Sequence, residues 1–83
     1  MIRDDSAYLK HMLDAILRIE KYLEHKDCQG FMENHLIQDG VIRQLEIIGE
    51  ATKKISDAVK AKHPEISWKD ISGMRDKLIH DYH

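Results

Sequence analysis

The sequence predicts an all-α fold, a small antiparallel bundle of three to four helices. Apolar residues recur at spacings of three and four along most of the 83 residues, and no segment of useful length alternates strictly between apolar and polar. A single proline and four glycines leave long stretches without a helix breaker. The predicted connections are short, which favours antiparallel neighbours within a single domain covering residues 1–83.

The first helix is predicted from about residue 4 to residue 24. Asp4, Asp5 and Ser6 offer capping groups and negative charge at its start. Its apolar residues at helical spacing are Leu9, Met12, Leu13, Ile16, Ile19 and Leu23. The apolar arc that they form is widened by Tyr8, Ala15 and Tyr22 on one side and by Leu17 on the other. This arc is broader than one partner helix needs.

A break at residues 25–30 is followed by a short helical turn near Phe31 and by a long helix predicted over residues 34–62. The main apolar stripe of the long helix is Ile37, Val41, Leu45, Ile48, Thr52, Ile55 and Val59. A weaker second stripe consists of Leu36, Gly40 and Ile47. That stripe is a candidate contact with a second protomer or, alternatively, with a fourth helix of the same chain.

Pro64 ends the preceding helix or starts the next element, and the last helix is predicted to begin near Trp68. Ile71, Met74 and Leu78 give this helix its apolar face. A chain of this length buries a modest fraction of its surface on folding, so we expect a homodimer.

Charge is unevenly distributed along the chain, whose formal net charge is −2. Residues 1–50 carry six Lys/Arg and ten Asp/Glu, a net of −4, and residues 51–83 carry seven and five, a net of +2. The second half is therefore the better place for an anionic ligand. The single cysteine, Cys28, suits a reducing compartment, and no apolar run approaches the ~18 residues of a membrane span. We expect a cytoplasmic protein without membrane contact.

Metal-ligand patterns are weak in this sequence. No glutamate has a histidine three residues later, which the di-metal sites of helical bundles require. His80 and His83 are three residues apart, but a full ligand set is missing. We expect neither a metal nor another cofactor.

Glu50 has two interpretations. It precedes Lys53 and Lys54 by three and four residues, the spacing of ion pairs on an exposed helical face. Glu46, four residues before Glu50, would extend this row of charged residues on the exposed face. Alternatively, Glu50 supports a site by orienting a cation.

The segment MRDKLIHDYH at residues 74–83 combines groups that act on phosphate. Arg75 carries a permanent charge on a planar fork suited to phosphate, and His80 is of a residue type that exchanges protons near pH ~6.5. Tyr82 adds a phenolic hydroxyl. Metal-free cleavage of RNA needs a base for the 2′-hydroxyl and a cation for the charge on phosphorus. The alternative is structural, with Arg75 and His80 satisfying carbonyls at a helix end.

One straight helix cannot bring these three side chains together. Arg75 and Tyr82 would share a face about 10 Å apart along the axis, whereas His80 would lie about 140° around from Arg75. Either the helix ends near His80, or Arg75 of one chain meets His80 of another at a dimer interface.

The string Arg75-Asp76-Lys77-Leu78-Ile79-His80-Asp81-Tyr82 fits R-x4-H-x-Y and resembles the motif of HEPN-domain proteins, specifically the HepT branch. VIRQLEIIGEATKKI at residues 41–55 and HPEISWKDISGMRDKLIHDY at residues 63–82 are similar to that family's long helix and its approach to the motif. HepT proteins are toxins of toxin–antitoxin pairs whose antitoxin is an MntA-type nucleotidyltransferase.

The resemblance implies an all-helical, dimeric, metal-independent ribonuclease. It assigns Arg75 and His80 as the catalytic pair, Asp76 as the polar residue that follows the arginine, and Tyr82 as the acceptor of AMP that the antitoxin transfers from ATP. It also implies a further C-terminal segment after the motif. A non-catalytic module that binds nucleotide or pairs with a nucleotidyltransferase is the alternative, and the RNA substrate, tRNA or mRNA, stays open.

Overall fold

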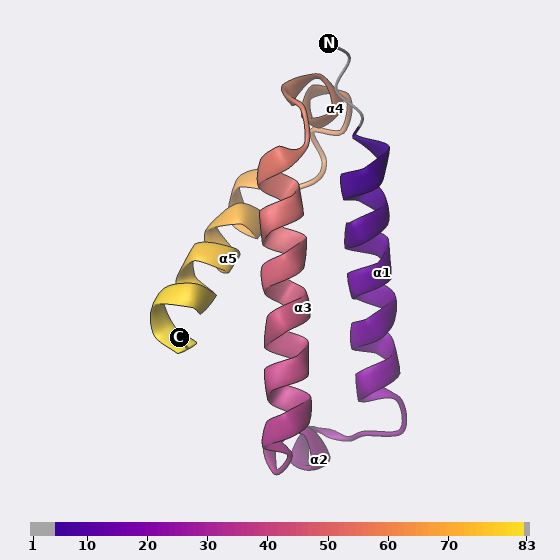
Figure 1. The fold of residues 1–83 in the computed structure, drawn as a ribbon, viewed down its shortest axis with the longest axis vertical. Coiled ribbons are helices and arrows are strands. Elements are labelled where there is room, and N and C mark those ends of the chain that lie inside the picture. The colour runs from indigo at the N-terminus through magenta and orange to yellow at the C-terminus, as the bar shows by residue number, and fades with distance from the viewer. Residues whose placement is uncertain (1–4, 83) are drawn as a thin grey trace.

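Three long helices lie side by side in the computed structural model, with α3 in the middle (Figure 1). The structure describes the backbone of residues 5–82 and the side chains of residues 5–80. Two short helices lie in the connections of the chain, α2 between α1 and α3 and α4 between α3 and α5. The bounds are α1 Ser6–Leu23, α2 Cys28–Met32, α3 His35–Lys54, α4 Asp57–Lys62 and α5 Trp68–Tyr82. The predicted all-α fold of a small helical domain is therefore confirmed, but the described residues form five helices and not the three to four predicted.

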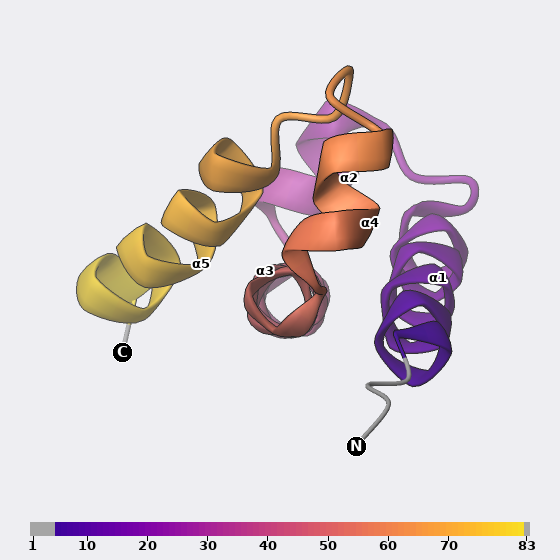
Figure 2. The ribbon, with the colours of Figure 1, turned by 90° about the horizontal axis from the view of Figure 1, so that it is seen from above.

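Helices α1 and α5 both pack on α3 and have little contact with each other. The view from above places them on opposite sides of α3 (Figure 2). The arrangement is thus an open layer around a central helix, and α5 diverges from α3 toward its C-terminal end (Figure 1). Because α3 has neighbours on both sides, it holds most of the buried side chains.

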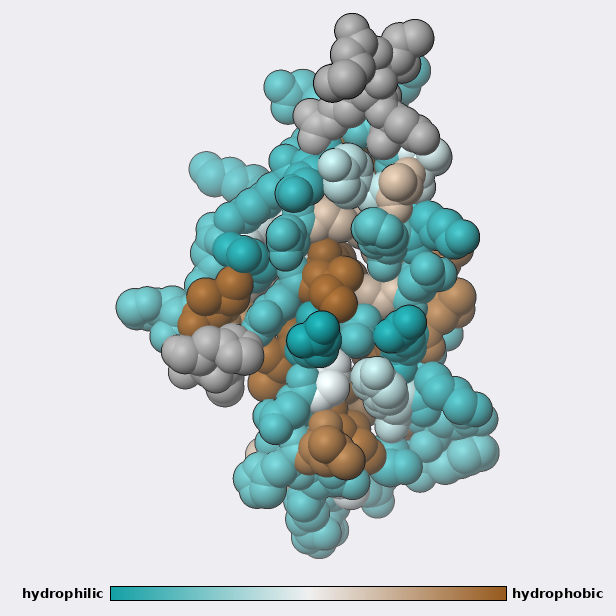
Figure 3. All heavy atoms as spheres, in the orientation of Figure 1, coloured by the Kyte–Doolittle hydropathy of each residue, from teal (hydrophilic) through white to brown (hydrophobic). Residues whose placement is uncertain are grey.

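The described core follows the stripe predicted for α3. Its buried residues are Val41, Gln44, Ile48, Gly49, Ala51 and Thr52, joined by Ala15 of α1 and by Ile55. The broad apolar arc of α1 is only partly covered, and apolar patches reach the surface in Figure 3. On α1 the exposed large apolar residues include Leu9, Leu13, Ile16 and Leu17, at 42–54% exposure. Within the described residues, no helix combines the length and the apolar character needed to cross a membrane.

The prediction of one helix over residues 34–62 is wrong, because the chain leaves helical geometry at Ile55. Ile55 is extended (ψ 138°) and 2% exposed, and Ser56 then caps α4 by accepting a hydrogen bond from the Val59 N–H. The Asp5 carboxylate accepts bonds from the Ser56 N–H at 2.8 Å and from its hydroxyl at 2.7 Å. A serine followed by Asp57 is a capping signal that competes with continuation of the helix.

The α2–α3 corner is held by side chains that cap the helix ends. Asp27 accepts a bond from the Gly30 N–H at 2.7 Å, and Asn34 accepts one from the Ile37 N–H at 3.0 Å. The Gln38 amide donates to the carbonyls of Phe31 and Met32, both at 2.8 Å. These bonds satisfy helix-end groups and fix where α2 and α3 begin.

Candidate functional site

Helix α5 carries the predicted catalytic residues without a break. It runs from Trp68 to Tyr82, so the expectation that the helix ends near His80 is wrong. Arg75 and His80 therefore stay about 140° apart around one helix. The alternative, in which a second chain completes the site, stays a prediction. The Tyr82 backbone belongs to α5, and its side chain lies outside the described residues.

Arg75 sits directly on the backbone of α3 at Gly49. A Cβ added to Gly49 would stand 2.1 Å from the Arg75 Cβ, closer than real side chains approach, and 3.2 Å from the Arg75 Cα, which is a tight contact. Glycine is therefore required here for the two helices to approach. The Arg75 side chain is 29% exposed, and its Nε is buried with no hydrogen-bond partner among the described residues.

Asp76, the residue after Arg75, receives two cations. Its Oδ1 forms an ion pair with the Lys53 ammonium of α3, and Arg75 Nη1 lies 3.4 Å from the same oxygen. The hydrogen bond from Lys53 is the main cause that lowers the pKa of the Asp76 carboxyl, and Arg75 contributes less. The group is exposed, so the attraction is screened by solvent.

Gly49 and Lys53 are the residues that sequence reasoning missed as neighbours of the site. Local spacing suggested Glu50 as the partner of Lys53, but Lys53 pairs with Asp76, 23 positions away. No short-range pattern predicts this pairing. Only the docking of α5 on α3 brings the two charges together.

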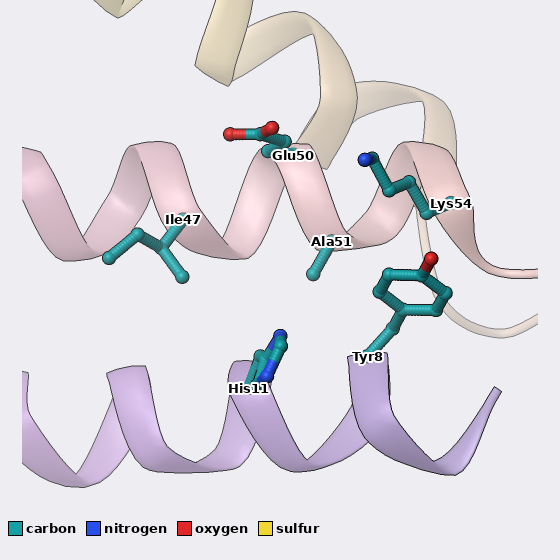
Figure 4. Close-up of a pocket in the computed structure, with 6 residues that line it drawn as sticks. All are labelled: Tyr8, His11, Ile47, Glu50, Ala51 and Lys54. Atoms are coloured by element: carbon teal, nitrogen blue, oxygen red, sulfur yellow. The ribbon is translucent and has the colours of Figure 1, made fainter.

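Glu50 directly follows Gly49 on α3, and its carboxylate is directed away from α1 (Figure 4). It lines a hollow of about 280 Å³ between α1 and α3, toward which Tyr8 and His11 reach from α1 (Figure 4). Ile47, Ala51 and Lys54 complete its lining. No hydrogen bond or ion pair joins Glu50 to Arg75 within the described residues. Its supporting role stays a prediction.

His80 is exposed in the last turn of α5, where solvent and other molecules reach it. The described part of the chain holds no cluster of three or more His, Cys, Asp or Glu residues able to bind a metal ion. The arrangement thus offers a guanidinium on a side chain whose base is fixed against α3, and an accessible imidazole, on one helix. These two groups can stabilise charge on a phosphate and move a proton.

Comparison with known proteins identifies the family. A family model described as ribonuclease HepT-like matches residues 12–83. A candidate RNase of Methanocaldococcus jannaschii is 44% identical over 80 residues, which span 96% of this chain and 69% of that protein. A candidate ribonuclease HepT of Thermococcus cleftensis is 44% identical over 82 residues, 99% of this chain and 74% of its own length.

A larger M. jannaschii protein, named as a gamma-glutamylcyclotransferase and candidate RNase, is 42% identical over 99% of this chain, which covers 37% of that protein. No solved structure matches the chain. The family model covers most of the chain, and the relatives match it nearly from end to end. The chain therefore belongs to the HepT-like ribonuclease family, which confirms the resemblance carried by the R-x4-H-x-Y motif and the enzyme class that it implied.

Proposed function

We propose that this chain is the toxin of a toxin–antitoxin pair and cleaves RNA without a metal. Membership of the HepT-like family supports the substrate class. The observation that supports the assignment of residues is the contact of Arg75 with Gly49, which fixes the base of the Arg75 side chain on the same helix that carries the exposed His80.

In the proposed reaction, His80 acts as general base or general acid. A base removes the proton of the 2′-hydroxyl, and the 2′-oxygen forms a bond to phosphorus while the bond to the 5′-oxygen breaks. The leaving 5′-oxygen takes a proton from an acid. Arg75 stabilises the negative charge on the phosphate oxygens during transfer. The products are a 2′,3′-cyclic phosphate and a 5′-hydroxyl, and DNA is not cleaved because it lacks the attacking group.

The active site is proposed to be composite, with Arg75 from one protomer and His80 from the other. Two side chains about 140° apart on one helix cannot converge on a single phosphate. Among the described residues, the Arg75 Nε is a buried donor without a hydrogen-bond partner, and such a donor costs roughly 1–3 kcal/mol. A change of the Arg75 rotamer on binding would bring Nε to an acceptor on a phosphate or on a second copy. Helix α5 lies at the edge of the layer, where a second copy has access (Figure 2).

Mixing two inactive variants tests the composite site. We expect Arg75→Ala and His80→Ala each to abolish cleavage without changing the helical circular-dichroism spectrum. An equimolar mixture that exchanges protomers should recover about a quarter of wild-type activity, because half of the dimers then hold one intact site. A mixture as inactive as its components, despite proven exchange, would refute the composite site. Cleavage that survives in His80→Ala would refute the role of His80.

Silencing is proposed to proceed by transfer of AMP from ATP to the Tyr82 hydroxyl, catalysed by an MntA-type nucleotidyltransferase. The transfer forms a bond between the tyrosine oxygen and the α-phosphorus and releases pyrophosphate. The added phosphate and adenosine would bring negative charge and bulk to the helix that carries Arg75 and His80. The RNA phosphate would then be repelled and displaced.

The test is incubation of the protein with total RNA, with and without the nucleotidyltransferase and ATP. We expect fragments that end in cyclic phosphate, loss of cleavage after treatment, and a mass increase of one AMP on the peptide that holds Tyr82. Tyr82→Phe should cleave RNA and resist silencing. Nucleotide binding without any RNA cleavage would instead favour a non-catalytic module.

A further inference from the structure

Two residues of α3, one helical turn apart, contact two consecutive residues of α5. Gly49 lies against Arg75, and Lys53 pairs with Asp76. Both contacts lie on the face of α3 that meets α5, away from the hollow that Glu50 lines. The α3 helix therefore fixes both the backbone of the catalytic arginine and the carboxylate beside it.

Two cations compete for this carboxylate. The Asp76 Oδ1 is shared between the Lys53 ammonium and Arg75 Nη1, and the contact with Arg75 is long at 3.4 Å. Carboxylates and phosphates compete for the same donors of a guanidinium, and close pairs of arginine with carboxylate are among the stronger hydrogen bonds. An Asp76 released from Lys53 would be free to close on Arg75.

We infer that Lys53 is a positioning residue of the ribonuclease site, because it holds the Asp76 carboxylate against α3 and limits its pairing with Arg75 to one long contact, so that Arg75 keeps donors for phosphate. The inference rests on the proposed role of Arg75. Loss of Lys53 lets Asp76 pair fully with Arg75, which places a negative charge where the RNA phosphate must bind. The effect therefore depends on Asp76 and disappears when that carboxylate is neutralised.

The competing explanation is an ordinary exposed salt bridge. Lys53 and Asp76 are 40% and 56% exposed, and such pairs contribute little to stability. If the pair is only such a salt bridge, Lys53→Met and Asp76→Asn should lose similar amounts of activity, and the double variant should recover none of it. The positioning role predicts that the second substitution reverses the first.

The experiment measures kcat and KM on a labelled single-stranded RNA for a set of matched variants. Lys53→Met should lower kcat/KM roughly ten-fold or more, whereas Lys53→Arg should retain activity. Adding Asp76→Asn to Lys53→Met should restore most of the loss. The control Lys54→Met removes the neighbouring charge, which lines the hollow on the α1 side, and should change little.

A second control separates position from net charge. Lys53→Met with Asp57→Asn has the same net charge as the rescued variant but leaves Asp76 free, so it should stay impaired. Unchanged kcat/KM in Lys53→Met, equal rescue by Asp57→Asn, or no rescue by Asp76→Asn would each overturn the inference.

Affinity for a 2′-O-methyl RNA gives a readout independent of cleavage. This RNA lacks the attacking hydroxyl but keeps the phosphates that Arg75 would bind. The positioning role predicts that Lys53→Met binds this RNA more weakly than the wild type. It also predicts that adding Asp76→Asn to Lys53→Met restores the affinity, whereas adding Asp57→Asn does not. This pattern supports the role of Lys53 even if the wild type cleaves no RNA. Absence of cleavage would refute the proposed function, whereas absence of this binding pattern would refute the role of Lys53.

Discussion

Helix α3 meets its two neighbours through a glycine in each case, but the two contacts differ. At Gly49 an added Cβ would strike the Cβ of Arg75 at 2.1 Å and its backbone Cα at 3.2 Å. At Gly40 an added Cβ would stand 3.2 Å from the ring of Tyr22 on α1. The first neighbour is the rigid start of a side chain, and the second is the far end of one that can rotate away.

The difference shows where the molecule tolerates adjustment. The α1–α3 interface is flanked by open hollows of about 280, 180 and 270 Å³, so side chains there have room to move. At the α3–α5 contact, backbone meets the base of a side chain, and Lys53 pairs with Asp76 beside it. The tighter of the two contacts therefore holds α5, the helix that contains the proposed catalytic residues.

The largest expected effect comes from Gly49→Ala. The methyl group must push α5 away from α3, which we expect to destabilise the fold by about 1–3 kcal/mol through overpacking. The gain in helix propensity, about 1 kcal/mol, offsets part of this cost. Displacement of Arg75 should also lower RNA cleavage. Urea denaturation and cleavage assays measure the two effects.

Gly40→Ala is the matched control for Gly49→Ala. Since the Tyr22 ring can turn, we expect unchanged or slightly higher stability and normal cleavage. If Gly49→Ala and Gly40→Ala change stability and cleavage equally, the α3–α5 contact is no tighter than the α1–α3 contact.

A smaller effect is expected at Ser56, which joins the start of α1 to the break after α3. Ser56→Ala removes the cap of α4 and the hydroxyl bonded to Asp5, so we expect a loss of about 1 kcal/mol in unfolding free energy. Under native conditions cleavage should be nearly unchanged, because Arg75 and Lys53 keep their contacts.

Ser72→Ala is the control for Ser56→Ala. The Ser72 hydroxyl donates to the Trp68 carbonyl one turn back, so its loss should change stability by less than about 0.5 kcal/mol. Equal losses at both serines in thermal melts would contradict the importance of the Asp5 contact.

The smallest effect concerns pH. The Lys53 ammonium lowers the pKa of Asp76 below its ordinary value of 3.8. The associated stabilisation is therefore present above that value and is lost as the pH falls through the lower pKa of the folded protein. We expect the stability difference between wild type and Asp76→Asn to shrink on acidification below 3.8. When both proteins also carry Lys53→Met, the stability difference caused by Asp76→Asn should be much smaller. An equally large difference in that background would contradict the pairing of Lys53 with Asp76.

Helix periodicity predicted most of the fold because it is a local property. The stripes in residues 4–24 and 34–62 located α1 and α3, and Trp68 marked the start of α5. The break at Ile55 was missed because its apolar side chain continues the stripe. Its cause is partly distant, since Asp5 binds both the backbone and the hydroxyl of Ser56.

The candidate site divides in the same way. The spacing of Arg75, His80 and Tyr82 was readable as a motif, and it led to the family. Gly49 and Lys53 were not readable as parts of the site. Their contacts reach residues 26 and 23 positions away, and they depend on how two helices dock.

By itself, the sequence determined the all-α class, the places of the long helices and the family, because helical spacing and a short motif are contained within neighbouring residues. The tertiary structure decided that Arg75 rests on Gly49. It also decided that Lys53 holds Asp76 rather than Glu50. The physical reason is that helix propensity acts over one or two turns, whereas close packing and ion pairing between helices depend on the docked arrangement.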